Sequence, residues 1–143
     1  MTQLSAFFKD SRAALGSAFY PKNFVFAAFP SYEFAEDAYR SLRDAGFPEN
    51  EMLAATGPEI LEFFDEYRKN EGALGAAMRG LSHLIDTEAK YIDTDIELAK
   101  TGAGFVVIHC SAEEESARIG QTVRSFSPIS MQWYRPIGVE ELT

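Results

Sequence analysis

One histidine in this sequence lies beside a run of carboxylates, which is the combination that a metal site needs. His83 precedes an acidic segment, residues 86–97, whose carboxylates are Asp86, Glu88, Asp93, Asp95 and Glu97. Imidazole and carboxylate ligands suit divalent metals. However, His83 is predicted to lie on one helix and most of the carboxylates on the next, and no E-x-x-H pair is present. The spacing favours a solvated acidic helix face, with no metal or other cofactor, and a metal site is the alternative.

A second histidine, His109, is followed directly by Cys110, the only cysteine. Neighbouring residues of a strand point to opposite faces, so these two cannot act on each other as nucleophile and base. We expect Cys110 to be a small buried residue, and His109 either to be bonded inside the core or to contact a ligand. The predicted wall of any pocket is the His109 face together with Trp133 or Tyr134 from the last strand, and His83 is a further candidate for ligand binding.

No motif for nucleotide binding or for hydrolysis is present in the sequence. It contains no G-x-x-x-x-G-K-[ST], no G-x-G-x-x-G after a strand, and no G-x-S-x-G. The 12 phenylalanines and 6 tyrosines could line a cavity for a flat ligand, but aromatic residues at helical spacing are typical of a plain core. An enzyme is the less favoured class, and we predict no catalytic residue.

Composition and charge restrict the expected domain organisation, partners and cellular setting of the protein. A chain of 143 residues with 46% hydrophobic content is expected to form a single domain over residues 1–143. Its formal charge of −9 repels nucleic acid and anionic lipid, so neither is an expected partner. A lone cysteine suggests a cytoplasmic setting. Charges at Lys9, Asp10 and Arg12 argue against a signal peptide, and no apolar run is long enough for a membrane span.

The hydrophobic pattern predicts an alternation of strands and helices that would position these residues. Strands are expected over about 24–29, 52–56, 104–110 and 129–135, and helices over about 1–18, 31–45, 57–70, 72–85, 87–101 and 111–123. Glycines at 46 and 102 are expected to end two of the helices. Two capping boxes, Thr56 with Glu59 and Ser111 with Glu114, are expected to begin two others.

The strands also suggest a topology. Those at 24–29 and 104–110 are apolar on both faces, as central strands are. The last strand alternates as an edge strand with one wet face would, with Ile129, Met131 and Trp133 on one face and Ser130, Gln132 and Tyr134 on the other. We therefore predict an α+β fold, a ferredoxin-like βαββαβ sandwich with sheet order 4-1-3-2. An extra N-terminal helix, residues 1–20, and a helical insertion, residues 57–101, are added to it. A doubly wound parallel sheet is the less favoured alternative.

The helix expected over 72–85, GALGAAMRGLSHLI, carries a face of small residues. Gly72, Ala76 and Gly80 share that face, opposite a larger apolar face made of Leu74, Ala77, Met78, Leu81, Leu84 and Ile85. Glycine inside a helix costs up to about 1 kcal/mol relative to alanine, so close approach by another helix is the expected compensation. We predict that this face packs against a second helix, within the chain or across a homodimer, and that Gly80→Leu would disturb the contact.

Two segments resemble a known family. FVFAAFPSYEFAEDAYRSLRDAGFPENEMLAAT shows a strand, a helix ending in L-x-x-x-G-F and a second strand, and IELAKTGAGFVVIHCSAEEESARIGQTVRSF shows a helix ending at a glycine pair, a strand and a helix. Together with the glycine- and alanine-rich GALGAAMRG, these segments resemble the heat-induced or general stress protein family of small bacterial ferredoxin-like domains. The resemblance implies association with stress and supplies no catalytic residues.

Two functions follow as hypotheses. The first is a non-catalytic, stress-associated module that acts by self-association, as a homodimer, and by binding a protein or a small ligand. The alternative is an enzyme or metal-binding protein that uses His83, His109 and the acidic segment 86–97.

Overall fold

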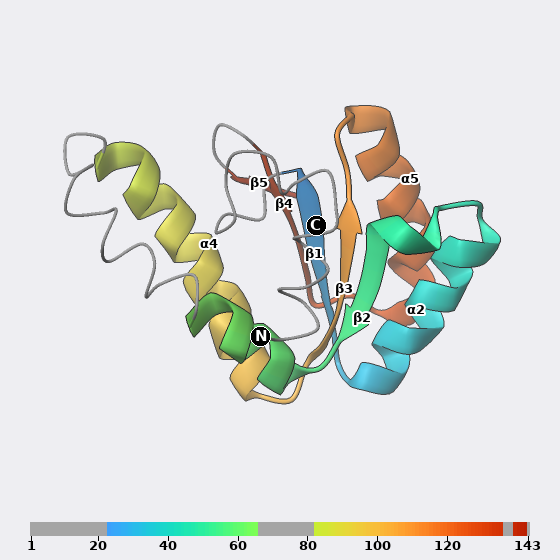
Figure 1. The fold of residues 1–143 in the computed structure, drawn as a ribbon, viewed down its shortest axis with the longest axis horizontal. Coiled ribbons are helices and arrows are strands. Elements are labelled where there is room, and N and C mark those ends of the chain that lie inside the picture. The colour runs from blue at the N-terminus through green and yellow to red at the C-terminus, as the bar shows by residue number, and fades with distance from the viewer. Residues whose placement is uncertain (1–22, 66–81, 136–138, 143) are drawn as a thin grey trace.

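The computed structural model describes residues 23–65, 82–135 and 139–142, and for residues 82–90 and 139 it describes the backbone only. A five-stranded antiparallel sheet lies at the centre, in the order β2-β3-β1-β4-β5 (Figure 1). Its strands are β1 (Phe24–Phe29), β2 (Met52–Ala55), β3 (Gly104–His109), β4 (Ser130–Tyr134) and β5 (Val139–Glu141). The predicted mixed α+β class is confirmed.

The predicted order, 4-1-3-2, is not the order of this sheet, because a fifth strand pairs outside β4. No hydrophobic pattern predicts β5, which is three residues long and contains Glu140 and Glu141. β4 is consequently an inner strand, and the prediction that one of its faces is wet is wrong. Residues 131–134 are all buried, including the polar Gln132 at 2% exposure.

The two strands that are apolar on both faces do lie inside the sheet. β1 pairs with β3 on one side and with β4 on the other, and β3 pairs with β1 and β2. Every residue of β1 is buried. The reason is that helices cover both faces of the sheet, so neither set of alternating side chains meets water.

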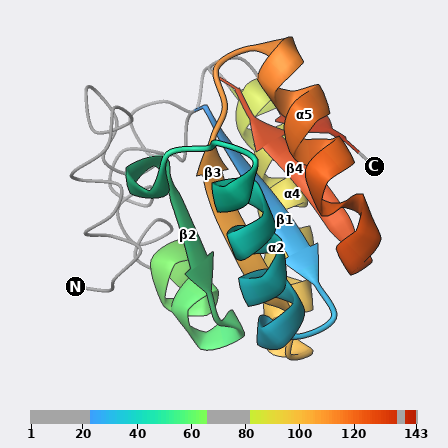
Figure 2. The same ribbon diagram turned by 90° about the vertical axis from the view of Figure 1, so that its right-hand side faces the viewer.

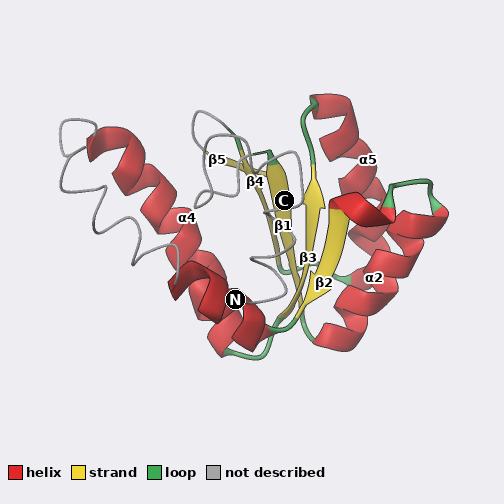
Figure 3. Cartoon of the chain, viewed as in Figure 1, coloured by secondary structure: helices red, strands yellow, loops and turns green. Residues whose placement is uncertain are grey.

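Each face of the sheet has its own helices (Figures 2 and 3). Helices α2 (Tyr32–Asp44) and α5 (Glu113–Val123) pack on one face, over a cluster that includes Val25, Ile108 and Trp133. The helix over residues 57–65 and α4 (Ser82–Lys100) pack on the other. Their cluster contains Phe24, Phe26, Ile60, Phe63, Phe64, Ile92, Phe105, Val107 and Tyr134. Within the described residues, no helix is both long and apolar enough to cross a membrane.

Several helix ends follow from local sequence. The Thr56–Glu59 capping box is confirmed, since the Thr56 amide donates to the Glu59 carboxylate at 3.1 Å and the Glu59 amide donates back to the Thr56 hydroxyl at 3.3 Å. The second box is wrong, because α5 begins after Ala112 and Glu115, instead of Glu114, accepts from the Ser111 amide. The glycines predicted to end α2 and α4 both have positive φ, 102° at position 46 and 95° at position 102.

Helix α4 corrects the expected division of the middle of the chain. A boundary between two helices is predicted near Asp86 and Thr87, but α4 runs without a break from Ser82 to Lys100. No glycine or proline lies between residues 82 and 100, so nothing forces the helix to stop. The backbone of His83 therefore belongs to the same helix as the acidic segment, contrary to the prediction.

Close approach of backbone segments holds two of the helices in place. A Cβ atom built at Gly104 would lie 2.6 Å from the Ser31 carbonyl oxygen, so only glycine lets β3 start against the beginning of α2. A Cβ at Gly57 would meet the Ala99 carbonyl in the same way. The helix over 57–65 is thereby set directly against the last turn of α4. Residues 72, 76 and 80, the predicted assembly face, lie outside the described residues.

Candidate functional site

A buried polar cluster joins α4 to β4. Asp95 of α4 has no exposed surface, and its carboxylate accepts two hydrogen bonds from the strand. The Tyr134 hydroxyl donates to Oδ2 at 2.6 Å, and Gln132 Nε2 donates to Oδ1 at 3.3 Å. The Gln132 amide group also donates to the Ser130 hydroxyl at 3.3 Å. Polar groups from one helix and one strand thus meet inside an otherwise apolar layer.

Ionisation of the Asp95 carboxyl group is unfavourable in this buried position. Burial raises the pKa of Asp95 from its ordinary 3.8 to about 7, and the hydrogen bond from Tyr134 opposes the increase in part. A second polar group of the cluster is also buried at a cost, since Gln132 Oε1 has no hydrogen-bond partner among the described residues. The cluster therefore contains a carboxyl group, that of Asp95, whose pKa lies near neutral pH. Beside it is a buried carbonyl oxygen, Gln132 Oε1, to which no described group donates.

Sequence reasoning missed this role of Asp95. The predicted solvated acidic face describes Asp93, which is exposed, and Glu97, whose side chain is 72% exposed, but it is wrong for Asp95. A signal was present in the sequence, because Asp95 lies between Ile92 and Ala99 at the spacing of one buried helix face. Its partner, Gln132, lies on the polar face of the alternating last strand, which predicts contact with water, so the sequence gives no reason to pair the two residues.

The structure divides the predicted ligand-binding residues between the two faces of the sheet. His109 pairs with Phe24 across the β1–β3 ladder, and Phe24 pairs with Tyr134 across the β1–β4 ladder, so all three share the face that α4 covers. The rings of Phe24 and His109 meet edge to face at 5.4 Å. Trp133 lies on the other face, where its indole donates to the Cys110 carbonyl at 2.8 Å. The side chain of His83 lies outside the described residues.

Cys110 is the small buried residue that the sequence predicts. It has no exposed surface and packs in the cluster beneath α2 and α5. Burial raises the pKa of its thiol to about 12, so the nucleophilic thiolate is disfavoured. Among the residues that the structure describes, no three His, Cys, Asp or Glu side chains come together as a metal-ligating group.

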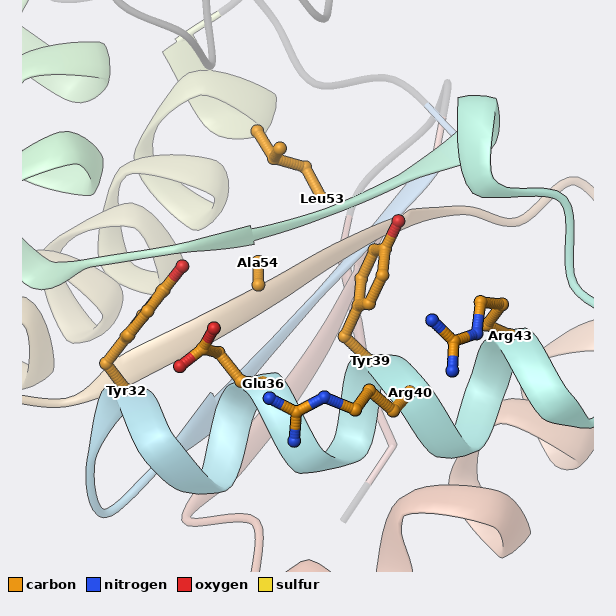
Figure 4. Close-up of a pocket in the computed structure, with 7 residues that line it drawn as sticks. All are labelled: Tyr32, Glu36, Tyr39, Arg40, Arg43, Leu53 and Ala54. Carbon is orange, nitrogen blue, oxygen red and sulfur yellow. The ribbon is translucent and has the colours of Figure 1, made fainter.

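A cleft of about 280 Å³ opens between α2 and the outer edge of β2 (Figure 4). Its lining residues are Tyr32, Glu36, Tyr39, Arg40, Arg43, Leu53 and Ala54. The rings of Tyr32 and Tyr39 rise from α2 on either side of Ala54, whose small side chain leaves the space between them (Figure 4). Burial, with nearby carboxylates, raises the pKa of both tyrosines, so their hydroxyls remain neutral hydrogen-bonding groups at physiological pH.

A smaller hollow, of about 230 Å³, includes His109. Glu51, Glu115 and Arg118 also line it, and Arg118 lies over the Phe47 ring at 4.6 Å from its centre. Its polar groups are partly or fully exposed, and two carboxylates, Glu51 and Glu115, line it with one guanidinium group, that of Arg118. His109 is therefore partly exposed at this end of β3, whereas Phe105 and Val107 of the same strand face are buried.

Comparison with known proteins found no relative of this chain: no family model, no curated protein and no solved structure matches it.

Proposed function

We propose that the protein is a non-catalytic module that acts by self-association, and that two copies pair through the outer edges of their β2 strands. The observation that carries this proposal is the contrast between the two edges of the sheet. β5 ends in Glu140 and Glu141, and Arg135 pairs with Glu140 at 3.2 Å. Charges of this kind are the usual protection of an edge against further pairing.

Within the described residues, the edge formed by β2 has no such charged protection. Its sequence, MLAA, contains neither a charge nor a proline, and in the part of the chain that the structure describes β2 pairs only with β3. An unprotected edge exposes backbone donors and acceptors that another strand can satisfy. Antiparallel pairing of β2 with itself around a two-fold axis satisfies these groups in both copies at once, as isologous contacts do.

The charges of α2 support a second copy of the chain as the partner. On the side that lines the cleft, this helix carries Glu36 in its first half and Arg40 and Arg43 in its second half. Within the helix, Arg40 also pairs with Asp37 at 2.6 Å and Arg43 with Asp44 at 3.4 Å, both exposed contacts. A two-fold axis at the middle of the β2 pair sets the two α2 helices antiparallel on one side of the extended sheet. The carboxylate of each cleft side then faces the guanidinium groups of the other, with Glu36 opposite Arg40 of the partner subunit. Such complementarity offsets the net charge of −9 that each copy carries.

The cleft beside β2 also fits this arrangement. Tyr32 and Tyr39 present ring surface and a hydroxyl each at the rim of the proposed contact, and tyrosine is enriched at protein interfaces for these properties. The stress-associated setting that we propose for the dimer comes from the family that the sequence resembles.

Sedimentation or light scattering of the full chain tests the proposal directly. We expect twice the monomer mass of 15.9 kDa at micromolar concentration. Ala54→Lys places a charge on the β2 edge and is expected to weaken association at least about tenfold, an effect of ~1.4 kcal/mol. Ala117→Lys, at an exposed position of α5, is the matched control and should leave the mass unchanged. A monomeric wild type, or a dimer that Ala54→Lys does not weaken, would show that β2 is not the interface.

Charge exchange tests the alignment of the two copies. Glu36→Arg and Arg40→Glu are each expected to weaken the dimer, because each puts like charges opposite one another. The double variant restores opposite charges in both pairs and should recover association. If it associates no better than either single variant, the proposed antiparallel contact of the α2 helices is wrong.

A further inference from the structure

We propose that Asp95, Gln132 and Tyr134 form a buried proton-binding site that makes the seating of α4 on β4 depend on pH. The inference rests on the polar cluster alone and is independent of the proposed dimer. Asp95 is completely buried, its two bonds come from the neutral groups of Tyr134 and Gln132, and no cation is within ion-pair distance in the described part of the chain. A carboxyl group in such surroundings is suited to its neutral form.

The hydrogen bonds of the cluster allow the proton to be present. With Asp95 ionised, the Tyr134 hydroxyl donates to Oδ2 across 2.6 Å; with Asp95 protonated on Oδ2, the acid can donate to the phenol oxygen over the same distance. The contact between helix and strand therefore survives protonation. Ionisation, in contrast, leaves a buried charge that, among the described residues, is stabilised by these two donors alone.

Other described groups that could stabilise the charge point elsewhere. On α4, Glu97 and Lys100 are exposed and pair with each other at 3.4 Å. On the helix over 57–65, Glu59 bonds to Thr56, while Glu62 and Asp65 are exposed. From β4, Tyr134 is the titratable group that faces Asp95, and β1 contributes the apolar Phe26, whose ring lies 5.2 Å from that of Tyr134. β5 also contacts α4, and its Glu141 lies opposite Gln132 on the same face, but this carboxylate is exposed and of the same charge as ionised Asp95. The proton is thus the natural neutralising ligand of the site.

The pH is also expected to influence whether α4 covers its face of the sheet. When α4 lifts from β4, Asp95 reaches water and ionises freely, so alkaline conditions favour the lifted state and acid conditions favour the seated one. Lifting uncovers aromatic surface around Phe26 and Tyr134. The cluster therefore couples a change in pH to exposure of apolar surface on that face.

Hydrogen exchange of the full chain, corrected for the intrinsic pH dependence of amide exchange, tests the site. We expect protection of the α4 amides over residues 92–100 to fall about tenfold per pH unit between about pH 5.5 and pH 7, and to stay below the protection of β3. Asp95→Asn should abolish this pH dependence, and Glu97→Gln, an exposed change on the same helix, should retain it.

A second variant, Tyr134→Phe, distinguishes loss of the titrating proton from a structural change caused by Asp95→Asn. Tyr134→Phe removes the donor that favours the ionised acid, so the pH at which protection levels off should move upward, while the pH dependence itself remains. The proposal is overturned if wild-type protection of α4 is independent of pH, if Asp95→Asn keeps the wild-type slope, or if α4 and β3 are equally protected and so open only together.

Discussion

The replacement Asp95→Asn should change how the stability of the whole protein depends on pH, whether or not α4 opens locally. Burial raises the pKa of Asp95 from 3.8 to about 7 in the folded protein. Between these values the folded state keeps a proton that the unfolded state has lost. The stabilisation is fully present below about pH 4 and is lost as the pH rises to about 7. At ~1.4 kcal/mol per pH unit, the whole change amounts to ~4 kcal/mol.

The measurement is the free energy of unfolding in urea, followed by the fluorescence of Trp133, the single tryptophan. About pH 5.5 and about pH 8 are suitable, because lower values approach the isoelectric point of 4.7, where solubility falls. Roughly 2 kcal/mol of the change falls inside this window. We therefore expect the free energy of unfolding of Asp95→Asn, minus that of the wild type, to rise by roughly 2 kcal/mol from the lower pH to the higher.

This comparison separates titration from packing. Any constant mismatch that the asparagine introduces beside Gln132 and Tyr134 contributes equally at both pH values and cancels from the change. Asp44→Asn makes the same chemical replacement at a position whose side chain is 73% exposed, and its difference from the wild type should not vary with pH. If the Asp95→Asn difference were as constant as that of Asp44→Asn, the folded protein would not hold the acid in its neutral form, and the reasoning from burial would be refuted.

Three other outcomes are expected. Gly104→Ala forces a Cβ against the backbone at the start of α2, so it should lower the free energy of unfolding by ~3 kcal/mol or prevent folding; an unchanged melting temperature would contradict the close approach. Trp133→Phe leaves the buried Cys110 carbonyl without this donor and should lower the free energy of unfolding by about 1–3 kcal/mol, measured in urea by circular dichroism because the variant has no tryptophan; an unchanged value would contradict the role of this bond. Cys110 itself should react with a thiol-specific disulfide reagent at pH 8 at least about a hundredfold more slowly in the native protein than in urea, and rapid native labelling would show that it is accessible.

Local sequence determined those features of the fold that depend on neighbouring residues. Strands β1 and β3 are apolar at every position or nearly so, which is sufficient to place them inside a sheet covered on both faces. Thr56 and Glu59 cap the helix that follows them because both bonding partners lie within one turn. The alternation of β4 likewise predicted that Trp133 and Tyr134 point in opposite directions.

Tertiary structure decided the features that depend on what lies opposite a residue. β5 carries two acidic residues in three and becomes a strand because β4 offers it an edge to pair with. That pairing turns β4 into an inner strand, and α4 covers its second face, so Gln132 is buried where its sequence pattern predicted water. Asp95 lies at the helical spacing of the core residues Ile92 and Ala99, but its side chain is a carboxylate, which is usually found at the surface. Only the meeting of α4 with β4 determines that it is buried and bonded to Tyr134, because the two partners lie 39 residues apart in the chain.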